Sequence, residues 1–467
     1  MNIYDETPYP SLVYTDTHPN KLATLATLHG VKPTAIEKCR VLELGCGDGT
    51  NLIAIAQSLP QAICIGIDLS ANQINDGQKV IDSISLNNIT LKQLNFNAID
   101  ESLGKFDYII AHGIYSWVPL SMQDIVLNLI KKHLTANGIA YISYNVYPGW
   151  HTEDVVRNMM MYHLQQLPAL SAKEQVTQAK GILQFITSLR QSGNDSFDIL
   201  LKEKSQQFQM LDDNYLSHDF LEPENHPVYF QQFVDRITQH DLTYITDIEF
   251  RHYLMLDFPP QVTEPMQKLF QNDFFKQEQY LDFFYHRTLR RSILCQQVVK
   301  RPLDWQRLFD CYVASNTDEL VDIQHPITKT AISHLREIYP QRLTFRELFK
   351  LSKRPAKNLS SLRNNLAQEL LHLYCLELVE LHAAAPTFTT KITKYPVASP
   401  LARHLTIPHS INLRCEFVEL SAIAKKLLPH LNGKNTQKDL LNILVNVTEE
   451  NLKNALLEIA QNALLMK

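Results

Sequence analysis

The chain contains the stretch Arg40-Val41-Leu42-Glu43-Leu44-Gly45-Cys46-Gly47-Asp48-Gly49-Thr50, in which a short apolar run leads into three glycines at alternate positions. The apolar run is typical of a buried strand, and the residues from Thr50 to Ser58 are typical of a helix. Glycines between a strand and a helix let the backbone approach a ligand closely, because no Cβ intervenes. The start of the helix also directs free N–H groups toward that ligand. An ordinary tight turn has a similar pattern, so the residues that follow decide between the two.

Strands and helices alternate after this stretch, which predicts a parallel sheet. Apolar strands are expected at 63–67, 89–95, 106–111 and 139–144. Ser70-Ala71-Asn72-Gln73 matches a capping box and predicts the start of a helix between the first two of these strands. Alternation of this kind is typical of a sheet covered by helices on both faces. Ligands of such sheets lie at the carboxyl ends of the strands.

Acidic residues beside the glycines favour S-adenosylmethionine over a dinucleotide. The spacing is G-x-G-x-G rather than G-x-G-x-x-G, and Glu43 and Asp48 flank it. Carboxylates would repel a pyrophosphate, whereas they attract the sulfonium and ammonium groups of S-adenosylmethionine. Asp68 ends the next strand, where a carboxylate can accept hydrogen bonds from both ribose hydroxyls. These residues together predict S-adenosylmethionine as the cofactor.

The length and composition predict a globular protein of several domains. The 467 residues are 45% hydrophobic and 20% charged. A helix, helix, strand order between Leu343 and His382 is typical of a winged-helix module. We expect four segments: a cofactor-binding domain with an N-terminal lid over 1–152, a helical dimerisation or linker region over 153–210, a middle domain over 211–301, and a winged-helix-like domain over 302–467.

Composition also argues against several classes of protein. The seven cysteines form no C-x-x-C pair and their number is odd, which favours reduced thiols in the cytoplasm. Residues 1–10 do not resemble a signal peptide, and no uncharged apolar run reaches the ~18 residues of a membrane span. A net charge of −5 without a long basic block argues against a nucleic-acid partner. No histidine or cysteine spacing indicates a metal site.

The stretch Val41 to Gly49 resembles the first motif of class I S-adenosylmethionine-dependent methyltransferases. The stretches 106–119 and 143–151, with Pro8-Tyr9-Pro10-Ser11 and Thr17-His18-Pro19, are similar to bacterial methyltransferases that carry a methyltransferase regulatory domain. That group includes the outer-membrane-protein lysine methyltransferases. The resemblance implies an α/β, Rossmann-like class I methyltransferase domain, followed by a helical or α+β middle (regulatory) domain and a winged-helix-like C-terminal domain.

The resemblance also implies positions around the cofactor. The family commonly ends its third strand with an acidic residue that contacts the adenine amino group; here Asn95 occupies that place, with Phe96 beside it. His112-Gly113 follows the fourth strand, where the family places backbone against the methionine moiety. The residues expected to bind the cofactor are Tyr9, His18, Glu43, Gly45, Cys46, Gly47, Gly49, Asp68, Leu69, Asn95, Phe96, His112 and Gly113.

Aromatic residues after the fourth and fifth strands are candidates for the substrate cavity. Aromatic walls would desolvate a lysine amine and hold its ammonium form by cation–π contacts. Methyl transfer is an SN2 step that depends mainly on alignment and on a neutral nitrogen. Each ring is equally compatible with a place in the core, because aromatic residues dominate cores. The candidate catalytic residues are Tyr115, Trp117, Tyr144, Tyr147, Trp150 and His151.

We therefore expect a cytoplasmic methyltransferase that uses S-adenosylmethionine to methylate lysine side chains of a protein, such as an outer-membrane or secreted protein before export. The apolar stripes of 153–210 predict a homodimer. The alternative is a small-molecule N- or O-methyltransferase whose extra domains regulate it. A nucleic-acid-associated protein is a third hypothesis, which the net charge disfavours.

Overall fold

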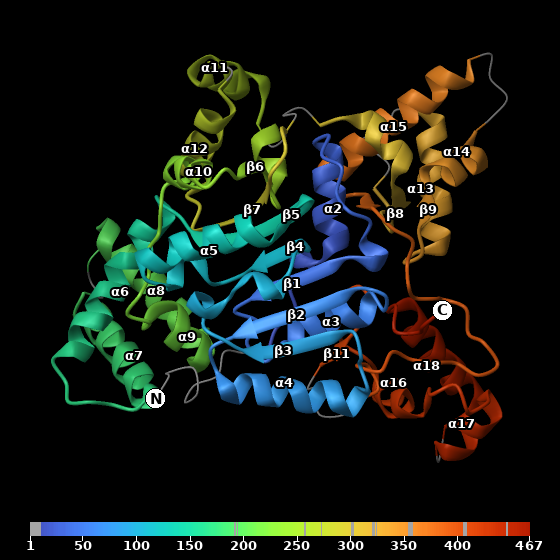
Figure 1. Cartoon of the computed structure of the whole chain (residues 1–467), viewed down its shortest axis with the longest axis horizontal. Coiled ribbons are helices and arrows are strands. Elements are labelled where there is room, and N and C mark those ends of the chain that lie inside the picture. Colours follow the sequence, from blue (N-terminus) through green and yellow to red (C-terminus); the bar gives the residue numbers. More distant parts are fainter. Residues whose placement is uncertain are drawn as a thin grey trace.

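A seven-stranded sheet lies at the centre of the molecule, in the order β3-β2-β1-β4-β5-β7-β6 (Figure 1). The chain is described here from a computed structural model, which covers residues 11–190, 193, 195–255, 258–271, 273–299, 303–319, 323, 325–353, 358–404, 409–444 and 447–467. The order and the interleaved helices confirm the expected α/β class I methyltransferase fold.

The first five strands are parallel, which confirms the parallel sheet predicted from the sequence. In β1, Val41 packs into one apolar cluster while Leu42 and Leu44 pack into the other, so both faces of the strand are buried. Burial on both faces explains why an almost continuous apolar run forms a central strand. The strands are β1 (Arg40–Leu44), β2 (Ile63–Asp68), β3 (Ile89–Gln93), β4 (Phe106–Ala111) and β5 (Leu134–Asn145).

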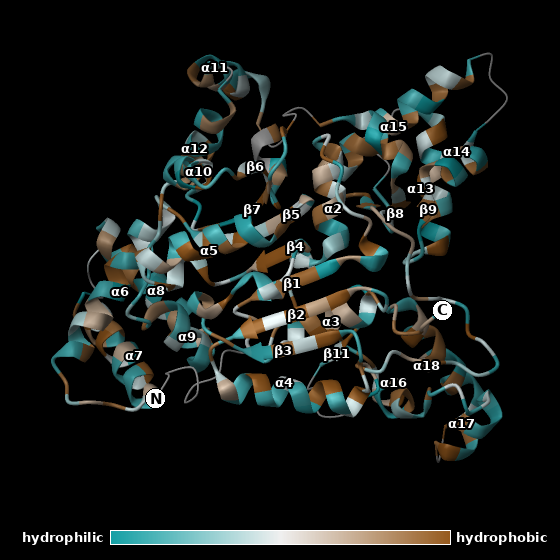
Figure 2. Cartoon of the chain, in the orientation of Figure 1, coloured by the Kyte–Doolittle hydropathy of each residue, from teal (hydrophilic) through white to brown (hydrophobic). Residues whose placement is uncertain are grey.

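Helices cover the two faces of the sheet. Apolar side chains of α2 (Pro19–Leu28), α3 (Thr50–Ser58) and α4 (Ala71–Ile84) pack on one face. Those of α5 (Leu120–His133) and α10 (Phe230–Gln239) pack on the other face. Brown, hydrophobic colour runs along the central strands in Figure 2, whereas α4 alternates between teal and brown. The covering helices leave the carboxyl ends of β1, β2 and β4 free to form a site.

Two strands from the middle of the chain complete the sheet. β7 (Leu289–Cys295) pairs antiparallel with β5, and β6 (Thr243–Asp247) pairs antiparallel with β7. The sequence predicted a separate unit over 211–301, but the sheet itself joins this region to the first domain. Without β7, the long strand β5 would present an unpaired edge. The domain boundaries as such stay a prediction.

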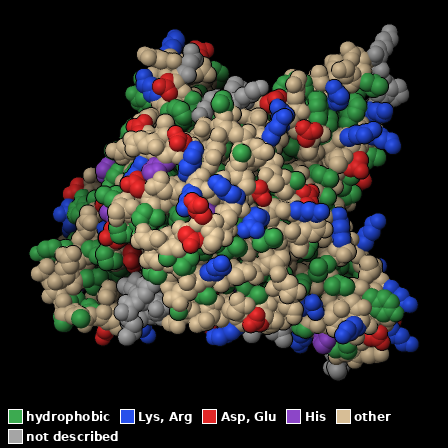
Figure 3. Space-filling view, viewed as in Figure 1, with side chains coloured by type: hydrophobic (Ala, Val, Ile, Leu, Met, Phe, Trp, Pro, Cys, Tyr) green, Lys and Arg blue, Asp and Glu red, His purple; other side chains and the backbone are tan. Residues whose placement is uncertain are grey.

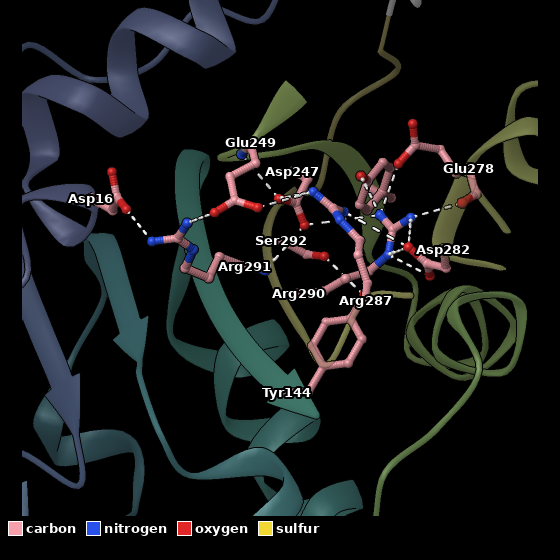
Figure 4. Close-up of polar contacts among 11 residues, drawn as sticks. Asp16, Tyr144, Asp247, Glu249, Glu278, Asp282, Arg287, Arg290, Arg291 and Ser292 are labelled. Carbon is pink, nitrogen blue, oxygen red and sulfur yellow. Dashed lines mark hydrogen bonds and ion pairs between the residues drawn. The ribbon is translucent and has the colours of Figure 1, made fainter. Parts of the chain in front are cut away.

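Arginine side chains of β7 anchor the added strands to their neighbours (Figure 4). Arg290 is fully buried, and its guanidinium lies 2.8 Å from carboxylate oxygens of both Glu278 and Asp282. The Tyr144 hydroxyl of β5 and the Ser292 hydroxyl of β7 share a hydrogen bond of 2.9 Å. These contacts connect β5, β7 and α12 (Phe274–Tyr285) through buried polar groups.

A helical bundle lies beside the sheet, where the sequence predicts helical structure over 153–210 (Figure 1). Its buried side chains form an apolar cluster of their own, which includes Met160, Leu183 and Phe208. The bundle consists of α6 (Gly149–Gln165), α7 (Ala172–Leu189), α8 (Ser196–Met210) and α9 (Asp213–Phe220), and α11 (Pro260–Phe270) packs near α12 in a separate group.

The C-terminal region contains two groups of short elements. The Thr344 hydroxyl caps α14 in a capping box with Glu347, so this helix begins two residues after the predicted start at Leu343. The first group consists of β8 (Tyr312–Ala314), α13 (Pro326–Ile338), β9 (Leu343–Thr344), α14 (Phe345–Ser352), α15 (Leu359–Cys375) and β10 (Glu380–His382). The second group consists of β11 (Ser410–Ile411), β12 (Phe417–Val418), α16 (Ala422–Leu427), α17 (Gln437–Ile443) and α18 (Glu449–Gln461).

Short 3-10 helices connect many of these elements. They are η1 (Thr15–Thr17), η2 (Ile36–Lys38), η3 (Phe96–Ala98), η4 (Glu101–Leu103), η5 (Tyr115–Trp117), η6 (Phe250–Leu254), η7 (Trp305–Asp310) and η8 (Leu428–His430). In the part of the chain that the structure describes, no helix has the length and apolar character needed to cross a membrane.

Candidate active site

The glycine turn after β1 forms one wall of a cavity at the carboxyl ends of the strands. Gly45, Gly47 and Gly49 have φ angles of +69°, +57° and +74°, which side chains disfavour. A Cβ at Gly45 would also lie 2.0 Å from Cδ1 of Ile114. The backbone N–H of Gly47 donates to Oδ2 of Asp68 at 2.8 Å, which fixes the turn against the end of β2.

The cavity has a volume of about 360 Å³, within the range of small-molecule sites. It is bounded by the ends of β1, β2 and β4, the segment after β3, the residues before η1, and α9. The sequence-predicted residues that line it are Glu43, Gly45, Cys46, Gly47, Asp68, Leu69, Asn95, Phe96, His112, Gly113 and Trp117.

Acidic side chains decide the charge of this cavity. Glu43, Asp48, Asp68 and Asp219 line it, and none of the described lining residues is a lysine or an arginine. Such a cavity attracts cationic groups and repels phosphates. This charge pattern agrees with the preference for S-adenosylmethionine over a dinucleotide that the glycine motif indicates.

Glu43 offers a buried acceptor to the cavity. The residue is 4% exposed, and its Oε1 accepts a hydrogen bond from Nδ2 of Asn51 at 2.7 Å. Its Oε2 is shielded from solvent and has no hydrogen-bond partner among the described residues. Burial raises the pKa of Glu43 to about 8, partly offset by the Asn51 hydrogen bond. An ammonium group in the cavity would satisfy this oxygen and favour the ionised form of Glu43, so Glu43 fits the amino-acid end of S-adenosylmethionine.

Asp68 keeps acceptor capacity for the ribose. Its Oδ2 accepts from the Gly47 N–H, and its Oδ1 accepts from the Ser70 N–H at 2.9 Å. An ionised carboxylate has about four acceptor sites, so these bonds leave acceptor capacity for a ribose hydroxyl. Burial raises the pKa of Asp68, and the backbone hydrogen bonds oppose that rise.

Asp219 of α9 is the most informative lining residue that the sequence did not reveal. Burial raises the pKa of its carboxyl to about 6, while a hydrogen bond from the Tyr215 hydroxyl opposes the rise. No local motif marks Asp219, because α9 reaches the cavity only through tertiary packing. The other lining residues not predicted to bind there are Leu12, Tyr14, Asn51, Gln73, Leu94, Ile114, Val118, Pro119, Met122 and His218.

Residues of the N-terminal segment line one side of the cavity, and the role of this segment as a lid stays a prediction. The centroids of the Tyr14 and His112 rings lie 3.8 Å apart, and the Tyr14 N–H donates to Oδ1 of Asn51 at 2.9 Å. Burial, followed by the charge of Arg291, lowers the pKa of His112 to about 3, so its ring is neutral. Tyr9, also predicted to bind the cofactor, lies outside the described residues.

Two other residues predicted to bind the cofactor do not line the cavity. His18 caps α2, because its Nδ1 accepts from the Asn20 N–H at 3.0 Å, and its Nε2 lies 2.8 Å from the Ser58 hydroxyl. Its ring lines a different crevice. Gly49 precedes α3 and acts through the shape of the turn.

Trp117 is the one predicted catalytic residue among those described that lines the cavity. Tyr115 and Tyr144 are buried in the core, where both rings pack against Phe233. The expectation that these two rings rim the cavity is therefore corrected. Their side chains point into the packing between the sheet and α10 because β5 is covered on that face.

The remaining aromatic candidates lie behind or beside the cavity. Trp150 is buried and makes an edge contact with Trp117 at 5.9 Å between ring centroids, so it supports that ring from behind. Tyr147 stacks on His151 with 4.0 Å between the ring centroids, and Nε2 of His151 lies 3.1 Å from the Tyr229 hydroxyl. These three candidates do not line the cavity, which corrects the expectation that they form its rim.

Comparisons with known proteins match successive parts of the chain. A methyltransferase domain matches residues 36–214, a predicted methyltransferase regulatory domain matches residues 212–296, and the C-terminal winged helix domain of PKMT matches residues 394–455. The protein RP028 of Rickettsia prowazekii (strain Madrid E) is 38% identical over 233 residues, which cover 50% of this chain and 92% of the relative. The protein RP789 of the same organism is 29% identical over 487 residues, which cover 96% of this chain and 86% of the relative.

A solved structure matches almost the whole chain. PKMT2 from Rickettsia typhi in complex with AdoHcy has a TM-score of 0.83 and 27% identity, covering 98% of this chain and 100% of that chain. The chain is therefore a class I S-adenosylmethionine-dependent methyltransferase, and S-adenosylmethionine is its cofactor. Within that class it belongs to the family that joins a methyltransferase regulatory domain to the C-terminal winged helix domain of PKMT.

Proposed function

We propose that the enzyme transfers methyl groups to lysine side chains of a protein substrate. The observation that carries this proposal is the acidic cavity itself, in which an aromatic ring (Trp117) and a carboxylate (Asp219) lie beside the predicted cofactor residues. A lysine presents a cation on an apolar stem, so a ring and a carboxylate are a matched pair of contacts for it. The similarity to PKMT2, a protein methyltransferase by its name, supports the same conclusion.

Most residues of the cavity hold and orient the reactants. S-adenosylmethionine supplies a methyl group on a positively charged sulfur when it is bound. We propose that Glu43 holds its ammonium group, that Asp68 accepts hydrogen bonds from its ribose, and that Asn95 and Phe96 contact its adenine. Holding both reactants in line accounts for most of the rate enhancement in a displacement of this type.

Asp219 is the proposed acceptor of the lysine proton. The attacking nitrogen needs a free electron pair, so a lysine ammonium must lose a proton before it reacts. A carboxyl whose pKa is about 6 is ionised near neutral pH and is a better proton acceptor than an exposed aspartate. Trp117 would hold the lysine stem while the amine loses solvent, which lowers the pKa of the amine.

Labelling distinguishes this function from methylation of a metabolite. The purified protein would be incubated with methyl-labelled S-adenosylmethionine and a lysate of the producing cells, and label in acid-precipitated protein would be compared with label in the soluble fraction. We expect label in protein, recovered after hydrolysis as methyl-lysine, and much less label with Trp117→Ala. Label confined to small molecules, or recovered on another residue type, would contradict the proposal.

We further propose that the protein forms a homodimer through the α6–α8 bundle. Hydrophobic side chains gather on the surface over this bundle, at the left of Figure 3. Exposed apolar patches of this kind mark interaction surfaces. The large apolar residues exposed on these helices are Val155, Tyr162, Phe185, Leu189, Phe197, Ile199 and Met210.

The cytoplasm is the proposed compartment, and an outer-membrane or secreted protein before export is the proposed substrate. All seven cysteines are unpaired and buried, as is typical of a reducing compartment. A protein on its way to export is unfolded in the cytoplasm, so its lysines would be accessible to the cavity.

A further inference from the structure

A second cavity lies on another side of the N-terminal segment. Its volume is about 300 Å³, and it is bounded by η1 and α2, the residues after β6, β10, and the segment 413–416. It shares no described lining residue with the cofactor cavity. Its size suffices for a small ligand. We call it the Arg342 crevice, after the residue that decides its chemistry.

The carboxylates of the Arg342 crevice already have basic partners. Arg291 binds two of them, Arg414 binds two others, and Arg251 lies 3.8 Å from the fifth. Paired carboxylates attract a further cation only weakly, because their charge is compensated. The acidic residues in question are Asp16 and Glu249 with Arg291, Glu380 and Glu416 with Arg414, and Glu377 with Arg251.

Arg342 lacks such compensation. Its Nη1 donates to the carbonyl oxygen of Ala384 at 3.2 Å, and its Nε is shielded from solvent without a hydrogen-bond partner among the described residues. No carboxylate of the described chain lies within 4.0 Å of its guanidinium, whereas each neighbouring carboxylate has a partner. Burial, together with the charge of Arg414, lowers the pKa of Arg342 to about 10, and the charges of Glu380 and Tyr312 oppose that fall. A partly buried guanidinium without a counter-ion is costly unless something else supplies the negative charge.

The neighbours of Arg342 supply little of that charge, because Glu380, whose charge acts on Arg342, is already paired with Arg414 and His382. His18 and His382 are buried nearby, and burial lowers their pKa values to about 3 and about 4, so both rings are neutral. The ring nitrogens of His382 are engaged by Asn20 and Glu380, and those of His18 by Asn20 and Ser58. Arg342 thus lines the crevice without a direct ion-pair partner among the described residues.

We propose that the Arg342 crevice binds a small ligand through an anionic oxygen group, either a carboxylate or a phosphate, with Arg342 as its principal cationic contact. A guanidinium presents parallel N–H donors that match both groups. The ligand would form the direct ion pair that Arg342 lacks among the described residues. The site is separate from methyl transfer and does not depend on the proposed lysine activity.

Calorimetric titration with inorganic phosphate and, separately, with succinate tests this site and distinguishes the two groups. The full chain would be titrated at fixed ionic strength as the wild type, as Arg342→Gln, and as the matched control Arg336→Gln, which removes an exposed arginine of α13. We expect one anion to bind with a single site, Arg342→Gln to lose about tenfold or more in affinity, and Arg336→Gln to bind as the wild type does.

Thermal unfolding provides the second readout, which also detects a misfolded variant. The bound anion should raise the melting temperature of the wild type and of Arg336→Gln, but not that of Arg342→Gln. Without anion, Arg342→Gln should unfold at the same temperature as the wild type or higher, because it removes an uncompensated charge. The proposal would be overturned if neither anion bound at millimolar concentration. It would also be overturned if Arg342→Gln and Arg336→Gln lost the same affinity for the anion.

Discussion

We propose that the cofactor cavity owes its selectivity to individual acidic residues in different environments. Glu43 is buried with one free oxygen, Asp68 is anchored by backbone N–H groups, and Asp219 has a pKa raised to about 6. The same side-chain chemistry thus serves three purposes, because burial and hydrogen bonding differ from one position to the next. One residue can therefore be changed to test one contact.

Replacement of Asp68 should weaken cofactor binding. Asp68→Asn keeps the size of the side chain but removes the charge that accepts hydrogen bonds from the ribose. Hydrogen bonds to a charged acceptor contribute about 1.5–3 kcal/mol each, so the affinity for S-adenosylhomocysteine should fall roughly tenfold or more. Calorimetry measures this, with Asp76→Asn on the exposed face of α4 as the control. Equal affinities for the two variants would refute the assignment.

The pH dependence of methyl transfer should report Asp219. Its pKa is raised to about 6, so the ionised, proton-accepting form increases as the pH rises through that value. We expect the single-turnover rate to rise between about pH 5 and pH 7 in the wild type. In Asp219→Asn this limb should disappear, while the affinity for S-adenosylhomocysteine is retained. A limb that persists in the variant would assign the titration to another group.

Those residues of the site that come directly after a strand could be predicted from the sequence. Gly45 to Gly49 and Asp68 are recognisable because the strand, the turn and the acid are adjacent or spaced by one helix. Asp219 and Tyr14 lie far from this motif in the chain and reach the cavity through tertiary packing, which no local pattern encodes. The aromatic candidates show the opposite error: Tyr144 lies at the carboxyl end of the expected strand, but its side chain enters the core.

At the scale of elements, the two aromatic positions Trp117 and Tyr144 should behave differently. Trp117 lines the cavity, so Trp117→Ala should slow methyl transfer with a small effect on stability. Tyr144 is fully buried, so Tyr144→Ala should cost about 3–5 kcal/mol of unfolding free energy. Denaturant unfolding and a turnover assay on both variants separate the roles. A strong loss of stability for Trp117→Ala alone would reverse the assignment.

β7 should depend on its buried arginine. Arg290 contacts Glu278 and Asp282 and lies 3.9 Å from the centroid of the Phe230 ring. Arg290→Met leaves the buried Glu278 carboxylate without its arginine partner and Asp282 with only the more distant Arg287 at 3.8 Å, which should cost about 3–5 kcal/mol. Arg336→Met removes an exposed ion pair and should change stability by less than about 1 kcal/mol. Chemical denaturation would measure both, and similar values would mean that the buried network contributes little.

The positions of strands could be predicted from the sequence more readily than the pairing between strands. The central strands β1, β4 and β5 contain the apolar runs of strands buried on both faces, so their positions were predictable, whereas the edge strand β3 alternates buried and exposed residues. β6 and β7 lie among aromatic and proline-rich segments, and the sequence does not reveal that they pair with β5. The pairing depends on contacts such as Tyr144 with Ser292, which join residues remote in the chain.

At the scale of the whole molecule, light scattering tests the proposed dimer. Exposed apolar side chains on α6–α8 should be buried by a second copy, so the mass in solution should be twice 53.7 kDa at micromolar concentration. The double variant Phe185→Glu with Leu189→Glu should shift the mass to that of one chain. A single-chain mass for the wild type would rule out the interface.

The structure of a complex with S-adenosylhomocysteine tests the central claim most directly. The account predicts the ligand in the cavity at the ends of β1, β2 and β4, with its ribose on Asp68, its amino group on Glu43, and its sulfur facing Trp117 and Asp219. A ligand bound elsewhere, or a sulfur turned away from Asp219, would contradict the account of how this enzyme brings a methyl group and a lysine together.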